Sequence, residues 1–443
     1  MTDAALLAEL IAERAQVATV CTEPAMIAFA GASAAQLLGC LPDEMSVVTC
    51  SGVFKNALGA GLPGTERRGP AMAAALGAVI NRPEAKLAIL QAITPEQLAA
   101  ADAMIDAGKV RAEADPTRDG VYVRITVRGG GHVATVTVAG GHSRVAEASR
   151  DGMPVTLDNE PADRQPSLAP AVPALPAKAD LTGLRGWSFE RLVAAALSLA
   201  YQDIAYLRDG AASNRALGDA VLDQRCTVPA SLGVPPLGLD LLSLVPSANA
   251  NAIDRRIRSL VSAAVAARMT GQEWPVLTSA GSGNQGITVG IPVSVVAEAL
   301  GVSADRQARA LGLAHAINLY VHAFIGEVSP ACGAVSATSG VAVAVCWLLD
   351  GDMSQMESAA QLTLACLLGM ICDGAKGSCA LKCGTGAVEG LMCGQWARSG
   401  VKLRAETGII GNSLSETLAL AQSIVEDGLR QADGLIIAAR NPS

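Results

Sequence analysis

Three cysteines are the residues of this sequence whose type and spacing most clearly permit chemistry. Cys332 follows a proline-containing turn, and Cys372 and Cys379 enclose the segment Asp-Gly-Ala-Lys-Gly-Ser. The apolar periodicity predicts that helices begin at Cys332 and Cys379 and that another helix ends at Cys372. Because a helix N-terminus carries a partial positive charge, it stabilises a thiolate. Three thiolates at helix ends could therefore enclose a metal and leave one coordination position free.

Two other interpretations of these cysteines remain open at this point. A single buried cysteine is most often a core residue, and Cys346 and Cys366 lie within apolar helical runs of that kind. A zinc site with Cys383 as a fourth ligand is the second interpretation, although structural zinc sites usually contain cysteine pairs about 2–4 residues apart. Cys372 and Cys379 have six residues between them. The spacing alone leaves a metal site and core packing about equally supported.

A glycine-rich segment supplies groups that could bind a carboxylate. Residues 279–286 read Ser-Ala-Gly-Ser-Gly-Asn-Gln-Gly, which combines backbone amides with the side chains of Ser282, Asn284 and Gln285. A phosphate-binding loop would need Gly-Lys-Ser/Thr, which the sequence lacks. The competing interpretation of this segment is a helix cap. Lys376 could orient a substrate carboxylate or pair with Asp373, and the sequence favours neither.

The elements that must position these residues begin with two predicted helices. Residues 4–16 have helical apolar spacing, and a second helix is predicted from Pro24, because proline is favoured at the first helical position. Short strands are predicted at 46–50, 86–91, 121–127 and 132–138, the last two forming a β-hairpin around a glycine turn. The glycine-rich residues 51–65 predict a loop. Helices are predicted at 70–80 and 95–107.

The remaining sequence favours helices. Five prolines between residues 161 and 176 predict a linker, and Ala-rich patterns predict long helices from residue 184 onward. These features predict an α+β fold, in which a small α/β domain with a β-hairpin accompanies a large, mainly α-helical domain. We assign residues 1–44 to N-terminal helices that carry Cys21 and pack on the helical domain. Residues 45–160 form the small domain, 161–183 a Pro/Ala-rich linker and 184–443 the helical domain, which holds the three cysteines.

Composition narrows the class of protein. Of the 443 residues, 51% are hydrophobic but only 3% are aromatic, so the core must be built from small and aliphatic side chains in closely packed helices. Apolar stretches such as residues 341–349 are shorter than the roughly 20 residues of a membrane span. The net charge is −8, and no dense run of Lys or Arg gives the footprint of a nucleic-acid-binding protein. With eleven cysteines and no signal-peptide pattern, we expect a cytoplasmic protein that binds neither nucleic acid nor membrane.

The cysteine segments and the glycine-rich loop together resemble the L-cysteine desulfidase family, which is related to the α-chain of iron–sulfur L-serine dehydratases. The matching segments are residues 279–286, Cys332-Gly, and Cys-Asp-Gly-Ala-Lys…Ser-Cys-Ala-Leu-Lys at 372–382. The Cys-Thr-Glu-Pro tetrapeptide at 21–24 and the loop at 51–65 also resemble this family. The matches run in the same order from residue 21 to about residue 390, so they cover most of the chain.

The resemblance implies a [4Fe–4S] cluster held by Cys332, Cys372 and Cys379. The fourth iron would bind the leaving group of a small amino-acid substrate, because a metal with an open position acts as a Lewis acid. The family also implies that Ser51 and Asn56 contact the substrate. The helical domain would then be an iron–sulfur domain.

The resemblance implies that Cys21 removes the α-proton of the substrate or caps the resting cluster. Its place before a helix favours a lowered thiol pKa, whereas the charge of Glu23 would raise that pKa. The competing interpretation is a structural cysteine in a turn. His142, which follows the β-hairpin, could also reach the site.

The implied reaction converts L-cysteine and water to pyruvate, ammonia and hydrogen sulfide without pyridoxal phosphate. Dehydration of L-serine or L-threonine with the same cluster is an alternative. Serine dehydratases carry a Ser-His-Thr segment, where residues 141–145 here read Gly-His-Ser-Arg-Val. Gly377 also stands where the family pattern has a proline. A non-catalytic iron–sulfur or zinc redox sensor is the alternative from another class, and a homodimer is compatible with all three.

Overall fold

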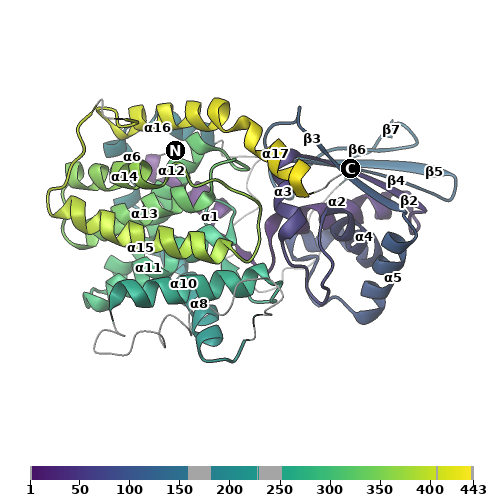
Figure 1. Ribbon diagram of the computed structural model, residues 1–443, viewed down its shortest axis with the longest axis horizontal. Helices are drawn as coiled ribbons and strands as arrows, with labels where there is room; N and C mark the ends of the chain where they lie inside the picture. The colour runs from purple at the N-terminus through teal and green to yellow at the C-terminus, as the bar shows by residue number, and fades with distance from the viewer. Residues whose placement is uncertain (1, 158–180, 227, 229–251, 406–407, 441–443) are drawn as a thin grey trace.

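The protein has a small domain with a β-sheet beside a larger helical body (Figure 1). A computed structural model describes residues 2–157, 181–226, 228, 252–405 and 408–440. The small domain with its sheet and the helical body together confirm the expected α+β class. The predicted linker at 161–183 lies outside the described residues except for 181–183, which begin the short helix η2 (Leu181–Gly186).

The small domain is built on a six-stranded sheet with the order β3-β2-β4-β5-β6-β7. Strand β2 pairs in parallel with β3, and the other neighbours are antiparallel. The predicted hairpin is confirmed as β4 and β5, which pair from Tyr122–Ala139 to Gly129–His132. The strands are β2 (Glu44–Cys50), β3 (Val110–Asp115), β4 (Tyr122–Gly129), β5 (His132–Ala139), β6 (Val145–Arg150) and β7 (Met153–Pro154).

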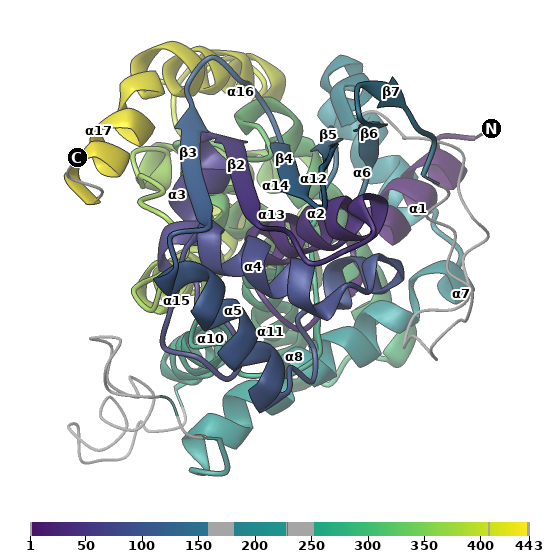
Figure 2. The same cartoon turned by 90° about the vertical axis from the view of Figure 1, so that its right-hand side faces the viewer.

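Three helices, α2 (Thr22–Leu38), α4 (Pro70–Ile80) and α5 (Pro95–Asp106), lie on one side of this sheet (Figures 1 and 2). Helices α2 and α4 approach closely, because a Cβ atom at Gly77 would overlap the backbone of Ala28. Helix α1 (Asp3–Arg14) packs against α6 (Phe189–Leu197) and α12 (Ala304–Ile325) of the helical body, whereas α2 packs against α4 and the sheet. Helix α1 buries one stripe of Leu7, Leu10 and Ile11, whereas α2 is buried nearly all round and fills the core beneath the sheet.

Two segments differ from the expected secondary structure. Most of the glycine-rich loop expected at 51–65 is a helix, α3 (Ser51–Gly59). A Cβ at Gly59 would lie 2.7 Å from the carbonyl oxygen of Ala375, so this glycine serves a close contact between domains and not a flexible loop. The strand expected at 86–91 is wrong, since η1 (Pro83–Ala88) is a 3-10 helix. Pro83 lacks the N–H that a strand would need and suits a helix start.

The helical body surrounds α13, which packs against four neighbouring helices. Small residues allow this packing, because Cβ atoms at Gly340 and Gly394 would meet the carbonyl oxygens of Ala314 and Ala342. The helices are α6 (Phe189–Leu197), α7 (Tyr201–Ile204), α8 (Tyr206–Leu222), α10 (Ile253–Met269), α11 (Gly283–Ala299), α12 (Ala304–Ile325), α13 (Gly333–Leu348), α14 (Met353–Leu367) and α15 (Cys379–Arg398).

Two contacts join the ends of the chain to the rest of the molecule. Strand β1 (Val17–Ala18) pairs with β8 (Val276–Leu277) of the helical body. After α16 (Leu414–Ser423) and the π-helix η4 (Ile424–Gly428), helix α17 (Arg430–Arg440) crosses back to α3, as Figure 1 shows. There the Lys55 ammonium lies 2.5 Å from a carboxylate oxygen of Asp433, and both side chains are buried. This ion pair ties the C-terminal helix to the small domain.

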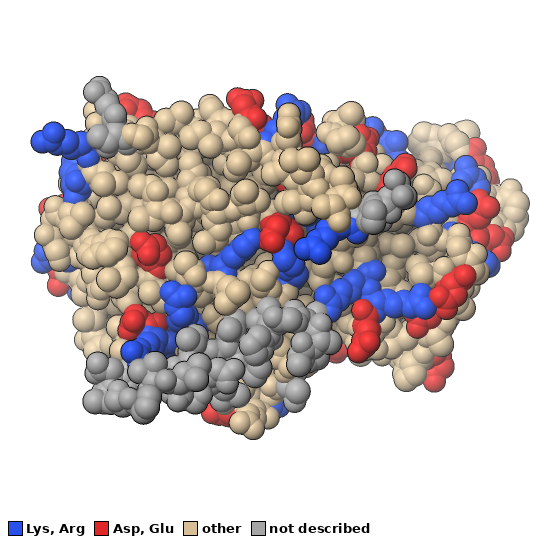
Figure 3. All heavy atoms as spheres, in the orientation of Figure 1, with Lys and Arg blue, Asp and Glu red and all other residues tan. Residues whose placement is uncertain are grey.

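The surface carries mixed charge. On the face shown in Figure 3, Lys and Arg side chains have Asp and Glu side chains among them. Within the described ranges, no helix has the length and apolar character needed to cross a membrane.

Candidate functional site

Two backbone segments bring the three cysteines together where the domains meet. Ala331 and Ile371 form an isolated antiparallel bridge, and the N–H of Cys332 donates to the carbonyl of Met370 at 2.8 Å. The N–H of Cys372 donates to the carbonyl of Pro330 at 2.7 Å. Cys332 is the N-cap residue of α13 and Cys379 is the first residue of α15. We call Cys332, Cys372 and Cys379 the interdomain cysteine group.

The loop between Cys372 and Cys379 is held by its own charged residues. Asp373 forms ion pairs with Lys376 and Lys382. Although burial acts to raise it, hydrogen bonds from the two lysines lower the pKa of Asp373 to about 2. The backbone N–H of Lys376 donates to the Sγ atom of Cys379 at 3.5 Å. Of the two interpretations of Lys376, the structure thus contains the pairing with Asp373.

The thiols of this group influence one another electrostatically. Burial, followed by the nearby thiols of Cys372, Cys383 and Cys379, raises the pKa of Cys332 well above its usual range. The same thiols would ionise readily beside a bound cation, because opposite charge favours the thiolate. Cys383 lies one helical turn after Cys379 and is buried, and burial raises its pKa to about 12. Four thiols therefore gather at one place, three of them from the predicted set.

The spacing of the donors separates two kinds of metal site. In the described part of the chain, one set of three ligand atoms lies within 4.8 Å of one another, at Cys366, Glu389 and Cys393. The interdomain cysteine group does not meet that limit. A single zinc ion would hold thiolates about 3.8 Å apart, since Zn–S bonds are about 2.3 Å. The wider arrangement of an all-thiol donor set suits a centre with several irons and sulfides.

Cys21 lies beside this group and is linked to it by hydrogen bonds. It is the N-cap residue of α2, only 5% exposed, and its thiol donates to a Glu23 carboxylate oxygen at 3.0 Å. The side-chain amide of Asn56 donates to the other Glu23 oxygen at 2.9 Å, and its oxygen accepts from the thiol of Cys372 at 3.7 Å. The predicted residues Cys21 and Asn56 are therefore in one connected network with Cys372.

The structure decides between the two effects expected on the Cys21 thiol. Burial, and then the charge of Glu23, raises the pKa of Cys21 well above its usual range, although Arg268 acts in the opposite direction. The lowered pKa that the helix position favoured is thus not found, because burial and the charge of Glu23 outweigh the opposing charge of Arg268. Glu23 itself has a lowered pKa: burial opposes ionisation, but His142 and the Cys21 thiol favour it. The resting proton lies on the thiol and the charge on Glu23.

Glu23 and Arg268 are the site residues that sequence reasoning missed as participants. The Glu23 carboxylate holds both Cys21 and Asn56, although the sequence interpretation treated it only as an opposing charge. Arg268 is 3% exposed at the end of the Ala-rich helix α10, and it donates to the carbonyl of Val20 at 2.8 Å. An isolated arginine in an apolar helical run is the signal that could have indicated it.

The glycine-rich loop lies beside Arg268. The guanidinium donates to the side-chain oxygen of Asn284 at 3.1 Å. The side chain of Gln285 lies against Gly333, where a Cβ would come within 2.5 Å of its amide nitrogen, and its buried oxygen has no hydrogen-bond partner. Ser282 caps helix α11 by accepting from the N–H of Gln285 at 3.5 Å, which is the helix-cap alternative. Asn284 and Gln285 thus lie between Arg268 and the start of α13.

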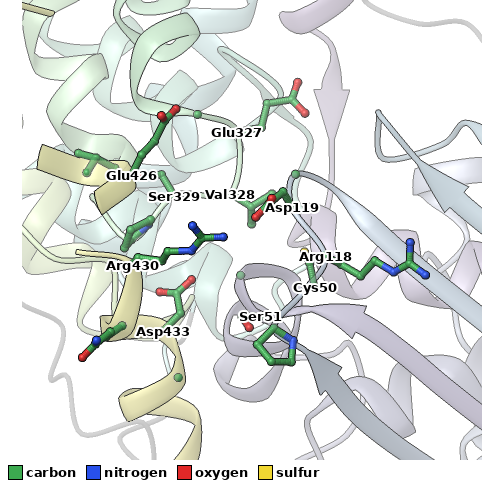
Figure 4. Close-up of a pocket in the computed structure, with 18 of the residues that line it drawn as sticks. Cys50, Ser51, Arg118, Asp119, Glu327, Val328, Ser329, Glu426, Arg430 and Asp433 are labelled. Atoms are coloured by element: carbon green, nitrogen blue, oxygen red, sulfur yellow. The ribbon is translucent and has the colours of Figure 1, made fainter. Parts of the chain in front are cut away.

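Ser51 lines a cavity of about 920 Å³ between the domains (Figure 4). The cavity extends to Pro330, two residues before Cys332, and Arg430 and Asp433 reach it from α17. Glu327, also in its wall, forms an ion pair with Arg14. The cavity reaches the segment that precedes Cys332, but the three cysteines of the interdomain group are not in its wall.

Two histidines that share the face of α12 are buried and remain core residues. Burial lowers the pKa of His315 and of His322 to about 4. Cys346 is also buried, as its apolar run predicts, but Cys366 is exposed and that prediction is wrong. Cys366 lies in the last turn of α14, and its side chain there is exposed to solvent.

Comparison with known proteins defines the class to which this fold and site belong. The model of the serine dehydratase alpha chain family matches residues 84–438, and the chain belongs to that family, whose name is that of a lyase. This confirms the expected relation to the serine dehydratase α-chain.

Individual relatives match along nearly their whole length. The UPF0597 protein of Moorella thermoacetica is 35% identical over 431 residues, which cover 97% of this chain and 96% of the relative. The UPF0597 protein TTE0269 of Caldanaerobacter subterraneus is 30% identical over 436 residues, which cover 98% of each. The UPF0597 protein of Desulfatibacillum aliphaticivorans is 33% identical over 424 residues, covering 94% of this chain and 93% of the relative.

Proposed function

We propose that the protein is an iron–sulfur lyase that removes the β-substituent of a small amino acid, with L-cysteine as the preferred substrate. The products would be pyruvate, ammonia and hydrogen sulfide, and pyridoxal phosphate would not take part. The observation that carries the proposal is the convergence of Cys332, Cys372 and Cys379 beside Cys21. Membership of the serine dehydratase alpha chain family supports the same class of reaction.

The three thiolates of the interdomain cysteine group would hold a [4Fe–4S] cluster. When bound, that cluster supplies a Lewis acid for the leaving group at the iron without a cysteine ligand. The protein around it carries cationic groups that offset the charge of a thiolate-bound cluster. Burial acts to lower the pKa of Lys382, but Asp373 first, and then the thiols of Cys332 and Cys379, raise it.

Cys21 and Glu23 would carry out the transfer of the α-proton of the substrate. The Cys21 thiol can accept a proton only after losing its own, and Glu23 lies 3.0 Å away as the acceptor. The thiolate then takes the α-proton, and the electrons of that C–H bond form the Cα–Cβ double bond. The Cβ–S bond breaks with its electron pair going to sulfur, which leaves as sulfide. The resulting enamine becomes an imine, and water releases pyruvate and ammonia.

The carboxylate of the substrate would be bound by groups that surround this pair. Arg268 is a buried cation beside Cys21, and Asn284 and Gln285 lie between it and Cys332. Asn56 would orient Glu23, and Ser51 lines the cavity through which a substrate could enter. Burial of Cys21 keeps bulk water from the proton-transfer pair, which strengthens the local electrostatic interactions.

L-Cysteine is preferred in this proposal because a thiolate is a softer ligand for iron in a sulfide cluster than an alcohol. Hydroxide is also the poorer leaving group. Dehydration of L-serine or L-threonine remains the second candidate, because the family bears that name and His142 contributes to the lowered pKa of Glu23. That contribution supports a role for the 141–145 segment near the site.

Anaerobic kinetics would test the proposal. Protein purified without oxygen should contain about four iron and four sulfide per chain, as in a [4Fe–4S] centre. The kcat/KM for L-cysteine should exceed that for L-serine and L-threonine when sulfide and pyruvate are measured separately. A tenfold preference for serine, equivalent to about 1.4 kcal/mol in the transition state, would replace the first candidate by the second. An intact cluster with no turnover of any of the three would indicate that the protein acts on another small substrate.

A further inference from the structure

A second group of metal-ligand atoms lies outside the proposed active site. Cys366 is in the last turn of α14, and Glu389 and Cys393 are four residues apart on α15. Their Sγ and carboxylate atoms all lie within 4.8 Å of one another. We call Cys366, Glu389 and Cys393 the helix-pair group.

The side chains of this group face one another and differ in exposure. The thiol of Cys393 donates to a carboxylate oxygen of Glu389 at 3.6 Å. Cys393 is fully buried, Glu389 is half-buried and Cys366 is exposed. A ligand could therefore approach from the Cys366 side and be held by a fixed donor beneath it. Residues four apart on a helix share one face, so Glu389 and Cys393 point in the same direction.

The carboxylate of Glu389 has no ion-pair partner among the described residues. Burial and the carboxylate of Glu389 raise the pKa of both thiols. A carboxylate between two thiols is the donor set that a divalent cation with affinity for sulfur would stabilise.

The helix-pair group is distant from the interdomain cysteine group. Cys393 follows Cys379 by 14 residues on the same helix. At a rise of about 1.5 Å per residue, this corresponds to roughly 21 Å along α15. The two groups can therefore bind different metals without sharing a ligand.

We propose that Cys366, Glu389 and Cys393 form a binding site for a divalent zinc-like ion, with water as the fourth ligand. Zinc accepts sulfur and carboxylate ligands in tetrahedral geometry at about 2.3 Å and 2.0–2.2 Å. Side-chain rotations would close the donors onto the ion. Binding converts two thiols to thiolates and releases two protons, and Glu389 enters as the carboxylate. The bound ion joins α14 to α15, the helices that flank the loop carrying Cys372.

Zinc binding to the anaerobically purified, iron-loaded protein tests this site. Wild-type protein should bind one equivalent of Zn²⁺ at unchanged iron content, and Zn²⁺ should raise its melting temperature, since a ligand of the native state stabilises it. Cobalt in place of zinc should give the thiolate charge-transfer and tetrahedral ligand-field absorption bands. Cys366→Ser is the main variant because Cys366 is exposed, and Glu389→Gln removes the carboxylate without removing a thiol.

Both variants should weaken zinc binding by more than the roughly 10–100-fold typical of removing an outer-shell partner. Cys40→Ser, another exposed free cysteine, is the matched control and should bind zinc like the wild type. The proposal is overturned if wild-type protein binds no added zinc, or if Cys366→Ser binds it equally well. A Cys366–Cys393 disulfide that forms under mild oxidation and resists zinc would also overturn it, by showing that the pair serves redox chemistry.

Discussion

The interdomain cysteine group and the helix-pair group contain the same type of residue in very different surroundings. Cys332, Cys372 and Cys379 lie in a loop and at helix starts, where the two domains meet. Lys55 donates from the small domain to the carbonyl of Cys372 at 2.8 Å. Cys366 and Cys393 instead lie on the facing sides of two helices within one domain.

The difference shows that spacing and local charge, more than the number of cysteines, select the centre that a group can hold. The interdomain group has thiols spread beyond single-ion distance, with lysines and an arginine around it. The helix-pair group has donors within single-ion distance and includes a carboxylate. The first suits an iron–sulfur cluster and the second a single divalent ion.

The largest effect should come from removing a thiol of the interdomain group. Cys372→Ala should abolish the brown colour, the bound iron and sulfide, and the turnover of L-cysteine, because two thiolates hold a cluster poorly. Cys366→Ala should leave all of these unchanged. Iron and sulfide analysis with an anaerobic sulfide-release assay checks both variants. Equal iron loss in Cys372→Ala and Cys366→Ala would show that the two cysteine groups do not differ in cluster binding.

Cys21→Ala should separate proton transfer from cluster binding. We expect wild-type iron content with kcat lowered roughly 10²–10⁴-fold, the usual contribution of a general base. The measurement is anaerobic kcat with L-cysteine beside the iron content of the same preparation. Cys40→Ala, at an exposed position, should keep full activity. Wild-type kcat in Cys21→Ala would reduce Cys21 to a structural residue.

Weakening the contact between the domains should lower cluster binding at the interdomain group and leave zinc binding at the helix-pair group unchanged. Asp433→Asn leaves the Lys55 ammonium buried without its counter-charge, and breaking such a pair costs about 3–5 kcal/mol. Urea unfolding should show this loss, and cluster occupancy should fall because Lys55 also binds the carbonyl of Cys372. Zinc binding at the helix-pair group should persist in the folded protein.

The exposed ion pair between Asp3 and Arg191 provides the control for that experiment. Asp3→Asn should change the urea midpoint little, since solvent screens exposed pairs. Unfolding of Asp433→Asn at the wild-type midpoint would show that the contact between the domains does not depend on this buried pair.

Acid should weaken both groups together, because they share the helical body. The pKa of His315 and of His322 is lowered to about 4 by burial, below the usual value of 6.5. The unfolded chain therefore binds protons that the folded chain does not, so stability is lost as the pH falls from 6.5 to about 4. The slope should be about 1.4 kcal/mol per pH unit for each histidine.

Urea unfolding at several pH values measures that slope. His315→Gln should reduce the slope of stability against pH by the contribution of one histidine. His132→Gln, at an exposed position, should leave that slope unchanged. An identical slope in His315→Gln would mean that other groups cause the acid sensitivity.

Local patterns predicted much of the fold. The alternation at β4 and β5, the proline in the first turn of α2 and the apolar stripe of α1 all specify their elements through nearest neighbours. The α3 and η1 segments were misread because their glycines and proline serve contacts and geometry that appear only in the folded chain. The sequence of α2 does not indicate that this helix packs beneath the sheet, since a helix that is apolar all round does not reveal its partner.

The sequence by itself determined that Cys332 and Cys379 stand at helix starts and that Cys21 precedes a helix, because short-range spacing sets both. The helix expected to end at Cys372 ends at Leu367 instead, so that part of the prediction is wrong. Only the tertiary structure decided that burial and Glu23 keep the Cys21 proton on sulfur, that Arg268 joins the site and that Asn56 links Glu23 to Cys372. These features depend on residues far apart in the chain, whose distances and desolvation arise from the packing of the two domains.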